Sequence, residues 1–502
     1  VLQDYVSQFG IANFYRTTYW LWRLAKLTEN FGNEDEARLL YSLALKHYRN
    51  NIDVNAIELH YDSLTMNRQH YYVPLDYYYE LVEYRKQVDT LRPPRGVLLN
   101  MGRWINSEYA DYGPTLNQTD DLIIFTTRRD IDKNPLNPVA VENLYFSRKY
   151  GEAWESAEPL EGINTVLDEG SACLSKDGRS IFFARLDAPD GFGSTDLYVA
   201  TLQEDSTWSQ AVNLGINVNS GGWDSHPSLT HSEDTLYFAS DRIGGFGLSD
   251  IYFSVKNDAG EWQEAQNVGP IINTRQNELS PFYHHRDEVL YFSSNNELLN
   301  FGEYDIYKTY QKKGNWIEPQ NIGPLVNGPG SEFYFTIDSR SENLYYARSA
   351  ENNLNNLDLY SFPVPMEAQP AANTKLTGQV NDETTGLPLQ GIVSIIDLDN
   401  GIEVAPQYLR PDGTFEFSLI NNNNYLIIVQ GDSYFRISEM FQLSDDTNLD
   451  ASIKPLSTKI KFESISFGNG ESKLTSDMYD DLDKIVDFLL DNPSFNLTIS
   501  GH

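Results

Sequence analysis

Five acidic residues recur at similar intervals through the middle of the chain and have the clearest potential for chemistry. Each stands directly before a strand-like segment, and three of them are followed by proline three positions later. A shared register would gather the carboxylates near one mouth of a central channel, where they could bind a cation or a basic peptide. An acid at a strand entry more often accepts backbone N–H bonds. Both interpretations stay open for Asp111, Glu169, Asp224, Glu278 and Glu332.

A second acidic series follows turns that are rich in glycine or asparagine. Aspartate at such a position typically caps a hairpin by accepting backbone N–H groups, so we expect turn caps here and not a binding site. The members of this series are Asp196, Asp250, Asp305 and Asp358.

No other set of side chains has the spacing of a catalytic or metal site. His284 and His285 are adjacent, and neighbouring residues on a strand face opposite sides of the sheet, so they cannot easily share a metal. The single cysteine, Cys173, excludes an internal disulfide and is expected to be a buried, inert thiol. Neither a His-Glu-x-x-His nor a Gly-x-Ser-x-Gly motif is present. The sequence therefore predicts no catalytic residue, metal or cofactor, and we expect that the chain is not an enzyme.

The segments that would position the acidic residues form a repeat. Each unit contains an apolar strand with a terminal aromatic pair, and then a second strand of the pattern Asp/Asn-aliphatic-Tyr. Five such units in residues 93–365 predict a five-bladed β-propeller of four-stranded blades. Tryptophans expected to pack between blades recur every 54 residues, at Trp154, Trp208, Trp262 and Trp316.

The two ends of the repeat region are expected to pair with each other. The fifth unit ends at residues 360–363 without a tryptophan strand, and an unmatched strand-like piece, residues 97–101, precedes the first unit. We expect this piece to complete the fifth blade, because closure of the ring removes two exposed strand edges.

The flanking segments give a multidomain fold class. Residues 1–92 have apolar residues at helical spacing, with Gly32 placed to end one helix and Asn33 to cap the next. Residues 366–374 have the composition of a polar Pro/Ala linker, and residues 375–456 alternate like the strands of a β-sandwich. Residues 457–502 predict an α/β segment whose helix has one apolar face: Met478, Leu482, Ile485, Val486 and Leu489.

Motifs in the first three parts resemble known families. The helices resemble the second half of a tetratricopeptide (TPR) repeat through Leu24, Ala25, Ala37, Tyr41 and Ala44, although Arg49 stands where that family has proline. The acid-x-x-Pro and Leu-Tyr-Phe signatures are similar to those of TolB-like PD40 propellers. The sandwich segment resembles the carboxypeptidase regulatory-like, transthyretin-like domain through Gly378-Gln379-Val380, Gly386-Leu387-Pro388-Leu389 and Asp412-Gly413-Thr414-Phe415.

The last part resembles the N-terminal half of the OmpA-like, peptidoglycan-binding domain. The matching residues are Phe467, Leu474, the segment 489–493 and the closing Gly501-His502. In that family Thr-Asp follows Gly-His, and this aspartate with a later arginine binds the diaminopimelate of the peptide stem. The resemblance therefore places the peptidoglycan-binding residues just beyond His502. The order of the four parts is similar to that of PorE-type envelope proteins of Bacteroidetes, which are associated with type IX secretion and PorP/SprF-like outer-membrane barrels.

Composition narrows the choice of partners. The chain has 72 acidic and 37 basic residues, a formal charge of -35, which disfavours nucleic acid as a partner. The sequence contains no run of about twenty apolar residues, so it predicts no membrane-spanning helix. The chain begins at Val1 without a leader, which is compatible with an exported protein, and a lipid-anchored cysteine could precede it.

These features predict a periplasmic, outer-membrane-associated, non-enzymatic scaffold. It would link an outer-membrane barrel, or a protein of the secretion or gliding machinery, to peptidoglycan. The alternative is a ligand-sensing propeller that binds a cation, a glycan or a basic peptide at its channel mouth.

Overall fold

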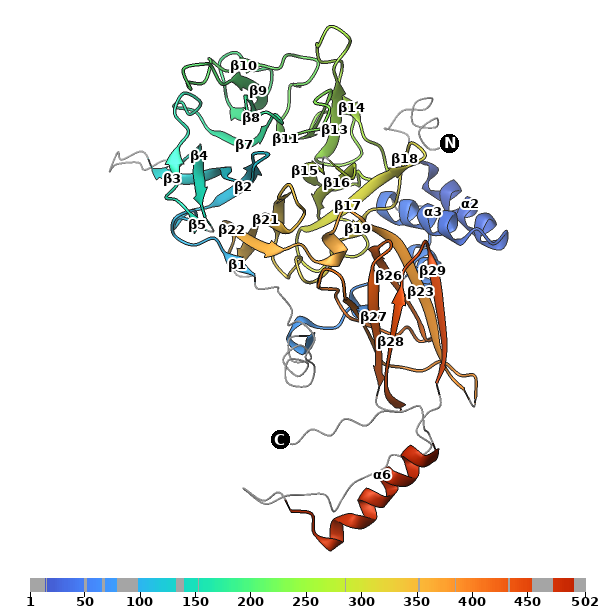
Figure 1. Ribbon diagram of the computed structural model, residues 1–502. Helices are drawn as coiled ribbons and strands as arrows, with labels where there is room; N and C mark the ends of the chain where they lie inside the picture. Colours follow the sequence, from blue (N-terminus) through green and yellow to red (C-terminus); the bar gives the residue numbers. More distant parts are fainter. Residues whose placement is uncertain are drawn as a thin grey trace.

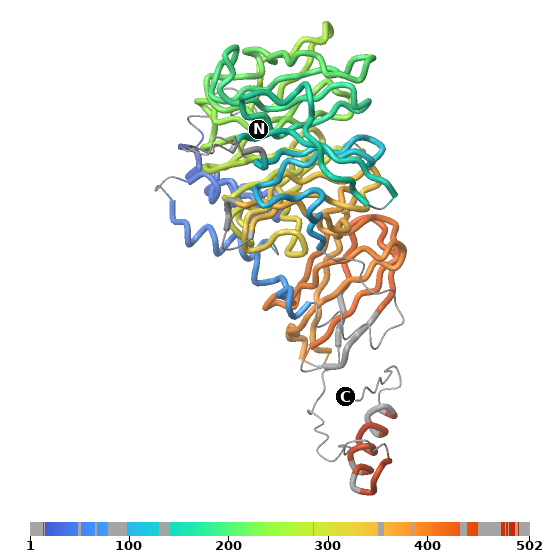
Figure 2. Tube along the Cα trace, turned by 90° about the vertical axis from the view of Figure 1, so that its left-hand side faces the viewer, coloured from blue at the N-terminus to red at the C-terminus, as the bar shows by residue number. Residues whose placement is uncertain are grey.

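The computed structural model describes residues 14, 16–48, 52–65, 68–78, 98–131, 140–151, 153–284, 286–350, 353–383, 385–431, 434–453 and 473–491. Five β-sheets surround a common centre, helices α2 and α3 lie at one edge of this ring, and two further sheets form a sandwich beside it (Figure 1). Turned by 90°, the sandwich extends away from the ring along the long direction of the molecule (Figure 2).

The five sheets of the ring are the blades predicted from the repeat, and their strands pair antiparallel in chain order. The first blade contains β2 (Asp111–Leu116), β3 (Leu122–Ile131), β4 (Ala140–Tyr150), β5 (Ala153–Trp154) and β6 (Glu158–Pro159). The second contains β7 (Glu169–Leu174), β8 (Ser180–Leu186), β9 (Thr195–Thr201) and β10 (Val212–Asn213). The third contains β11 (Asp224–Leu229), β12 (Thr235–Ser240), β13 (Asp250–Val255) and β14 (Gln266–Asn267).

The fourth and fifth blades follow the same plan. Their strands are β15 (Glu278–His284), β16 (Val289–Ser294), β17 (Asp305–Lys312), β18 (Asn315–Trp316) and β19 (Gln320–Asn321); and β20 (Glu332–Ile337), β21 (Asn343–Ala350), β22 (Asn353–Pro363) and β1 (Leu99–Asn100).

The ring closes through the N-terminal strand, as the register of the repeat predicts. β1 pairs antiparallel with β22, with Leu99 opposite Ser361 and Asn100 opposite Tyr360. The Asn106 side chain secures this junction, because its amide oxygen accepts the Leu359 N–H at 2.8 Å and its amide nitrogen donates to the Leu359 carbonyl at 2.9 Å. The edge strand of the fifth blade is thus covered by a segment from the start of the ring.

Tryptophans pack between blades, as expected. In three blades the indole meets an aromatic ring of the preceding blade edge-on, at centroid distances of 6.3, 6.4 and 6.5 Å for the pairs Trp154–Tyr345, Trp262–Phe182 and Trp316–Tyr237. Such pairs add about 0.5–1.5 kcal/mol beyond the burial of their surface.

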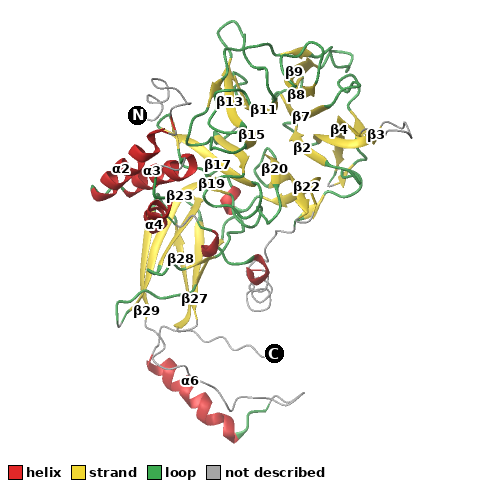
Figure 3. Cartoon of the chain, turned by 180° about the vertical axis from the view of Figure 1, so that it is seen from behind, coloured by secondary structure: helices red, strands yellow, loops and turns green. Residues whose placement is uncertain are grey.

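The described residues of the N-terminal segment include the helices α2 (Thr18–Asn30), α3 (Glu34–His47) and α4 (Val54–Leu64). Gly32 adopts a φ of 76° after α2, and the Asn33 side chain accepts the Glu36 N–H at the start of α3, as the sequence predicts. Seen from behind, these helices lie beside both the propeller and the sandwich (Figure 3).

The C-terminal end of α3 is held on the propeller by buried polar contacts. Lys46 Nζ donates to Glu297 at 2.7 Å and to the Ile271 carbonyl at 2.8 Å. His47 Nε2 lies 2.9 Å from the Pro270 carbonyl oxygen. Burial lowers the pKa of His47 to about 3, so its ring is neutral and donates this bond.

The sandwich consists of a three-stranded and a four-stranded sheet around one apolar core. β29 runs parallel to β23, whereas the other pairs are antiparallel. The strands are β23 (Ala372–Asp382), β26 (Thr414–Ile420) and β29 (Thr447–Ile453) in one sheet, and β24 (Ile392–Asp397), β25 (Gln407–Tyr408), β27 (Asn424–Gly431) and β28 (Tyr434–Gln442) in the other.

The segment whose composition suggested an exposed linker is largely buried. It forms a 3-10 turn, η3 (Met366–Ala368), and its Met366 and Ala368 side chains are fully buried. Lys308 Nζ donates to the carbonyl oxygens of Gln369 at 2.8 Å and Ala372 at 3.2 Å. The propeller and the sandwich therefore share a packed junction where we had expected a tether.

The C-terminal helix predicted from the sequence is α6 (Tyr479–Asp491), which follows the short turn η4 (Ser476–Met478). The strands expected around Phe467 and at residues 497–502, on which the OmpA-like assignment also depends, lie outside the described residues. Within the described part, no helix is long and apolar enough to cross a membrane.

We predict that His47 makes the attachment of the helices sensitive to acid. Because the folded state lowers the pKa of His47 to about 3, the stability that neutral His47 contributes is present above pH 6.5 and is lost as the pH falls toward 3. His47→Gln keeps an N–H donor without this titration. The unfolding midpoint should therefore fall less between pH 7 and pH 4.5 in His47→Gln than in the parent chain, and equal falls would contradict this role.

Candidate functional site

The five predicted acidic residues begin the innermost strands of the five blades, and all five are fully buried. Each carboxylate accepts the backbone N–H of the residue four positions earlier. The donors are Ser107, Thr165, Ser220, Thr274 and Gly328, at distances from 2.5 to 3.0 Å. The acids therefore fix the linker that enters each blade.

In four blades an arginine from the second strand, or just after its end, lies within ion-pair distance of the buried acid. The pairs are Asp111–Arg129, Glu169–Arg185, Asp224–Arg242 and Glu332–Arg348, with nitrogen–oxygen distances of 2.8, 2.9, 2.7 and 3.1 Å. Each glutamate meets an arginine directly opposite in the strand register. Each aspartate instead meets an arginine two residues further along the second strand, on the same face.

The fourth blade lacks this arginine. Ser294 stands opposite Glu278 and donates its hydroxyl at 2.8 Å, while Thr274 donates its N–H and its hydroxyl, both at 2.7 Å. Burial, together with the nearby charge of Asp250, raises the pKa of Glu278 to about 8. Glu278 therefore holds a proton at neutral pH.

This geometry corrects the idea that the acidic series offers a ring of free carboxylates to a cation or a basic peptide. The side chains point into their own blades and are bonded there, which agrees with the structural interpretation. Three members of the second acidic series cap turns as expected: Asp196, Asp250 and Asp305 each accept two backbone N–H groups and an asparagine amide. The fourth, Asp358, accepts the Asn100 side-chain amide, and its turn cap stays a prediction.

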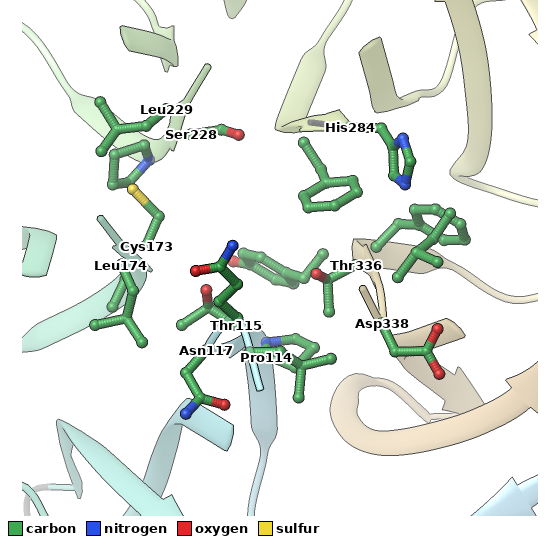
Figure 4. Close-up of a pocket in the computed structure, with 18 of the residues that line it drawn as sticks. Pro114, Thr115, Asn117, Cys173, Leu174, Ser228, Leu229, His284, Thr336 and Asp338 are labelled. Carbon is green, nitrogen blue, oxygen red and sulfur yellow. The ribbon is translucent and has the colours of Figure 1, made fainter. Parts of the chain in front are cut away.

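The cavity of the propeller lies at the opposite end of the innermost strands. It measures about 530 Å³ and is lined by the later residues of these strands and by the hairpins that follow them. Figure 4 shows side chains from all five blades around the opening, among them Asn117, Cys173, Leu229, His284 and Asp338. We call this cavity the central cup.

A backbone distortion common to the five innermost strands shapes the floor of the cup. The third residue of each strand has a positive φ, between 51° and 65°, and the strand register shifts at this point. This is a β-bulge, which re-aims the side chains next to it. The five residues are Gly113, Ser171, His226, Ser280 and Tyr334. Only the first is a glycine, so the distortion leaves little signature in the residue types.

Two of these residues meet across the floor of the cup. His226 Nε2 lies 3.1 Å from the Tyr334 hydroxyl, and His226 Nδ1 accepts the Ser280 N–H at 3.1 Å. Burial lowers the pKa of His226 to about 3, so the ring is neutral. The Ser280 hydroxyl is buried and has no hydrogen-bond partner among the described residues. It is therefore a donor that a bound molecule could satisfy.

The rim of the cup carries cations, in contrast to the acidic chain as a whole. Lys176, Arg286 and Arg340 line it and are exposed. The two carboxylates of the lining are engaged with backbone groups, because Asp120 accepts the N–H of Ser339 and Asp338 accepts those of Glu342 and Asn343. The arrangement suits a molecule with an apolar body, hydroxyls and a negative charge.

The thiol of Cys173 forms part of the wall of the cup. Burial raises its pKa to about 12, so it is protonated at neutral pH and is a poor nucleophile. This environment agrees with the inert role expected for the only cysteine.

No family model and no curated protein matches the chain. Solved structures with similar folds include TolB from Agrobacterium tumefaciens, with 11% identity and a TM-score of 0.34 over 54% of this chain and 92% of that one. An endo-arabinanase from Bacillus licheniformis has 10% identity and a TM-score of 0.34 over 51% and 94%. A sialidase from Trypanosoma rangeli has 9% identity and a TM-score of 0.35 over 72% and 92%. At these values the likeness concerns the β-propeller fold alone.

These neighbours correct the expectation that the chain is not an enzyme. Arabinanases and a sialidase are glycoside hydrolases built on propellers, so this fold gives no ground for excluding catalysis. The absence of familiar motifs in the sequence does not restore that exclusion.

We predict that the buried acids matter for stability according to whether they have an arginine partner. Asp224→Asn keeps an acceptor oxygen but leaves Arg242 without its counter-charge, and it should destabilise the protein by about 3–5 kcal/mol. Glu278→Gln, the matched control in the blade without arginine, should cost less than about 1 kcal/mol because a neutral group replaces a neutral group. Chemical denaturation measures both changes, and equal losses would contradict the assignment.

Proposed function

We propose that the protein is a periplasmic scaffold that binds a partner at the outer membrane and is joined to peptidoglycan by its C-terminal domain. The observation that carries this proposal is the continuity of its three described parts. Helices, propeller and sandwich meet through buried polar contacts, which suits a protein that holds its partners at a fixed spacing.

The contacts between the parts support this role because they reach across the whole body. Tyr61 of α4 donates to Glu318 of the propeller at 3.0 Å, and Arg38 of α3 lies 3.3 Å from the same carboxylate. Arg410 of the sandwich donates to the Asp62 carbonyl at 3.0 Å. Each part is thus bonded to the other two, and relative motion would leave buried charges without partners.

The connection to the cell wall rests on the sequence resemblance of residues 457–502 to OmpA-like domains. The association with type IX secretion and with a PorP/SprF-like partner rests on the order of the parts. An outer-membrane-associated location in the periplasm follows from the same resemblances.

The scaffold proposal predicts binding to the cell wall through a completed C-terminal domain. A form of the protein that continues through the expected Thr-Asp segment should co-sediment with purified peptidoglycan, whereas the chain that stops at His502 should stay in the supernatant. Retained binding by the shorter chain would place the contact elsewhere. Loss of binding by both forms would contradict the proposed anchor.

The central cup favours a second function, the sensing of an acidic glycan. Its hydroxyls, its unpartnered Ser280 and its cationic rim match the hydroxyls and the carboxylate of a uronic acid or a muramic acid. This site replaces the acidic mouth as the place for such a ligand.

Calorimetric titration with galacturonate and N-acetylmuramate tests the cup. Arg340→Ala should weaken binding about tenfold, since a charge-assisted hydrogen bond contributes about 1.5–3 kcal/mol. Arg103→Ala removes an exposed arginine outside the cup lining and should leave the affinity unchanged. Absence of binding by both sugars, or an equal effect of the two substitutions, would exclude this function.

A further inference from the structure

The loops between the second and third strands repeat one local structure in blades two, three and four. A phenylalanine stands four residues before the capping aspartate, and its N–H donates to that carboxylate at 2.6 to 2.7 Å. The aspartate also accepts the amide of an asparagine in the outer strand. The equivalent phenylalanines are Phe192, Phe246 and Phe301.

The linkers to the next blade are equally uniform. The same asparagines, Asn213, Asn267 and Asn321, accept the N–H of a glycine with positive φ that begins each linker. The residue after that glycine is therefore held at one position relative to the phenylalanine. The equivalent residues are Ile216, Pro270 and Pro324.

In the third blade this position is occupied by the chain itself. The ring of His47 lies 5.5 Å from the ring of Phe246, and its Nε2 donates to the Pro270 carbonyl. The preceding residue of α3, Lys46, reaches Glu297 in the corresponding loop of the next blade. Two successive helix residues thus contact the phenylalanine, the linker and the next loop. We call such a set of three positions a seat.

The seat of the fourth blade is covered as well. Tyr72 lies edge-on to Phe301, with ring centroids 5.4 Å apart. The Glu367 side chain lies close to Gly323, which begins the linker, and Pro324 is buried. Both covered seats therefore have a buried proline in the linker.

The seat of the second blade is built in the same way, but no described residue covers it. Phe192 is 48% exposed and Ile216 is 63% exposed. The position of Glu297, three residues after the serine that faces the blade acid, is taken by Ile243, whose side chain is fully exposed. All three positions of this seat are apolar.

The residue type at the linker position distinguishes the second-blade seat from the two other exposed linkers. In the exposed linkers between blades five and one and between blades one and two, the residue three positions before the linker asparagine is charged. It is Arg103 in the first of these linkers and Glu161 in the second, where Leu160 replaces the glycine. An exposed isoleucine in their place costs hydrophobic free energy unless another surface covers it.

We propose that the seat formed by Phe192, Ile216 and Ile243 is the docking site for the end of an α-helix of a partner protein. The helix class follows from the third blade, where the end of α3 fills the equivalent seat. With Ile243 in place of Glu297, the incoming helix presents apolar side chains and does not need the lysine that α3 uses.

This inference rests on the proposed scaffold role and names one of its contact surfaces. The test places the photo-reactive residue p-benzoylphenylalanine at position 192 of the protein in its native envelope. Irradiation should give one adduct, and the attached partner peptide should belong to the end of a helix and carry apolar residues there.

Matched substitutions make the test specific. Ile216→Glu introduces the residue found at the equivalent position between blades one and two, so it should fold with an unchanged unfolding midpoint and reduce the adduct about tenfold or more. Val166→Glu alters another exposed apolar residue, on the linker between blades one and two, and should leave the adduct yield unchanged.

Three results would overturn the proposal: no adduct, an adduct with a second copy of this chain, or a yield that Ile216→Glu does not change. Co-sedimentation with peptidoglycan, measured on the same variants, separates this outcome from failure of the scaffold role. The Ile216→Glu variant should still co-sediment with peptidoglycan. If the unsubstituted protein failed to co-sediment, that would contradict the anchor, and the adduct would still test the seat.

Discussion

The structure depends on pairing each charge that folding removes from water with a partner fixed in the same blade. A carboxylate begins every innermost strand, and an unpaired one would cost several kcal/mol in the interior. Four blades supply an arginine within ion-pair distance, and burial raises the pKa of the fifth carboxylate, Glu278, to about 8, as it also does for Glu332 beside Arg348. Because the same groups accept the N–H of the entering linker, the charge pairs also set where one blade ends and the next begins.

The same constraint operates between the domains. Lys308 is buried at the junction with the sandwich, and Lys46 is buried at the junction with the helices. Each donates to partners on the neighbouring part of the chain, so separation of the parts would expose apolar surface and leave a buried, hydrogen-bonded amine without its acceptors. A packed turn at Met366 and Ala368 strengthens the first junction. These contacts give the scaffold proposal its physical basis.

The repeat allowed much of the propeller to be predicted. Alignment of the units located the blades, the tryptophan contacts and the completion of the fifth blade by the strand at residues 97–101, because all of these follow from one shared register. The acids were found but their arginines were not. The arginine lies 16 residues after Glu169 and 18 after Asp224, so a single column of the alignment does not contain it.

Other features could not be read from local pattern. The bulge that forms the floor of the cup falls on Ser171, His226, Ser280 and Tyr334, residues that do not usually adopt a positive φ. The contacts of Lys46 and His47 span more than 220 residues of sequence. The buried turn at Met366 was taken for a linker because its composition is polar and proline-rich, whereas its burial is decided by the surfaces on both sides. The TPR and OmpA-like assignments stay predictions.

The most direct test of the account is the distance between the propeller and the sandwich in solution. Spin labels at Asp205→Cys, in an exposed hairpin of the second blade, and at Leu387→Cys, on the sandwich, report this distance by double electron–electron resonance. A rigid body joined through Lys308 and η3 predicts one narrow distribution, and the Lys308→Ala form should broaden it. A broad distribution in the parent protein would show that the parts move independently, and would contradict the claim that one continuous body holds the partners at a fixed spacing.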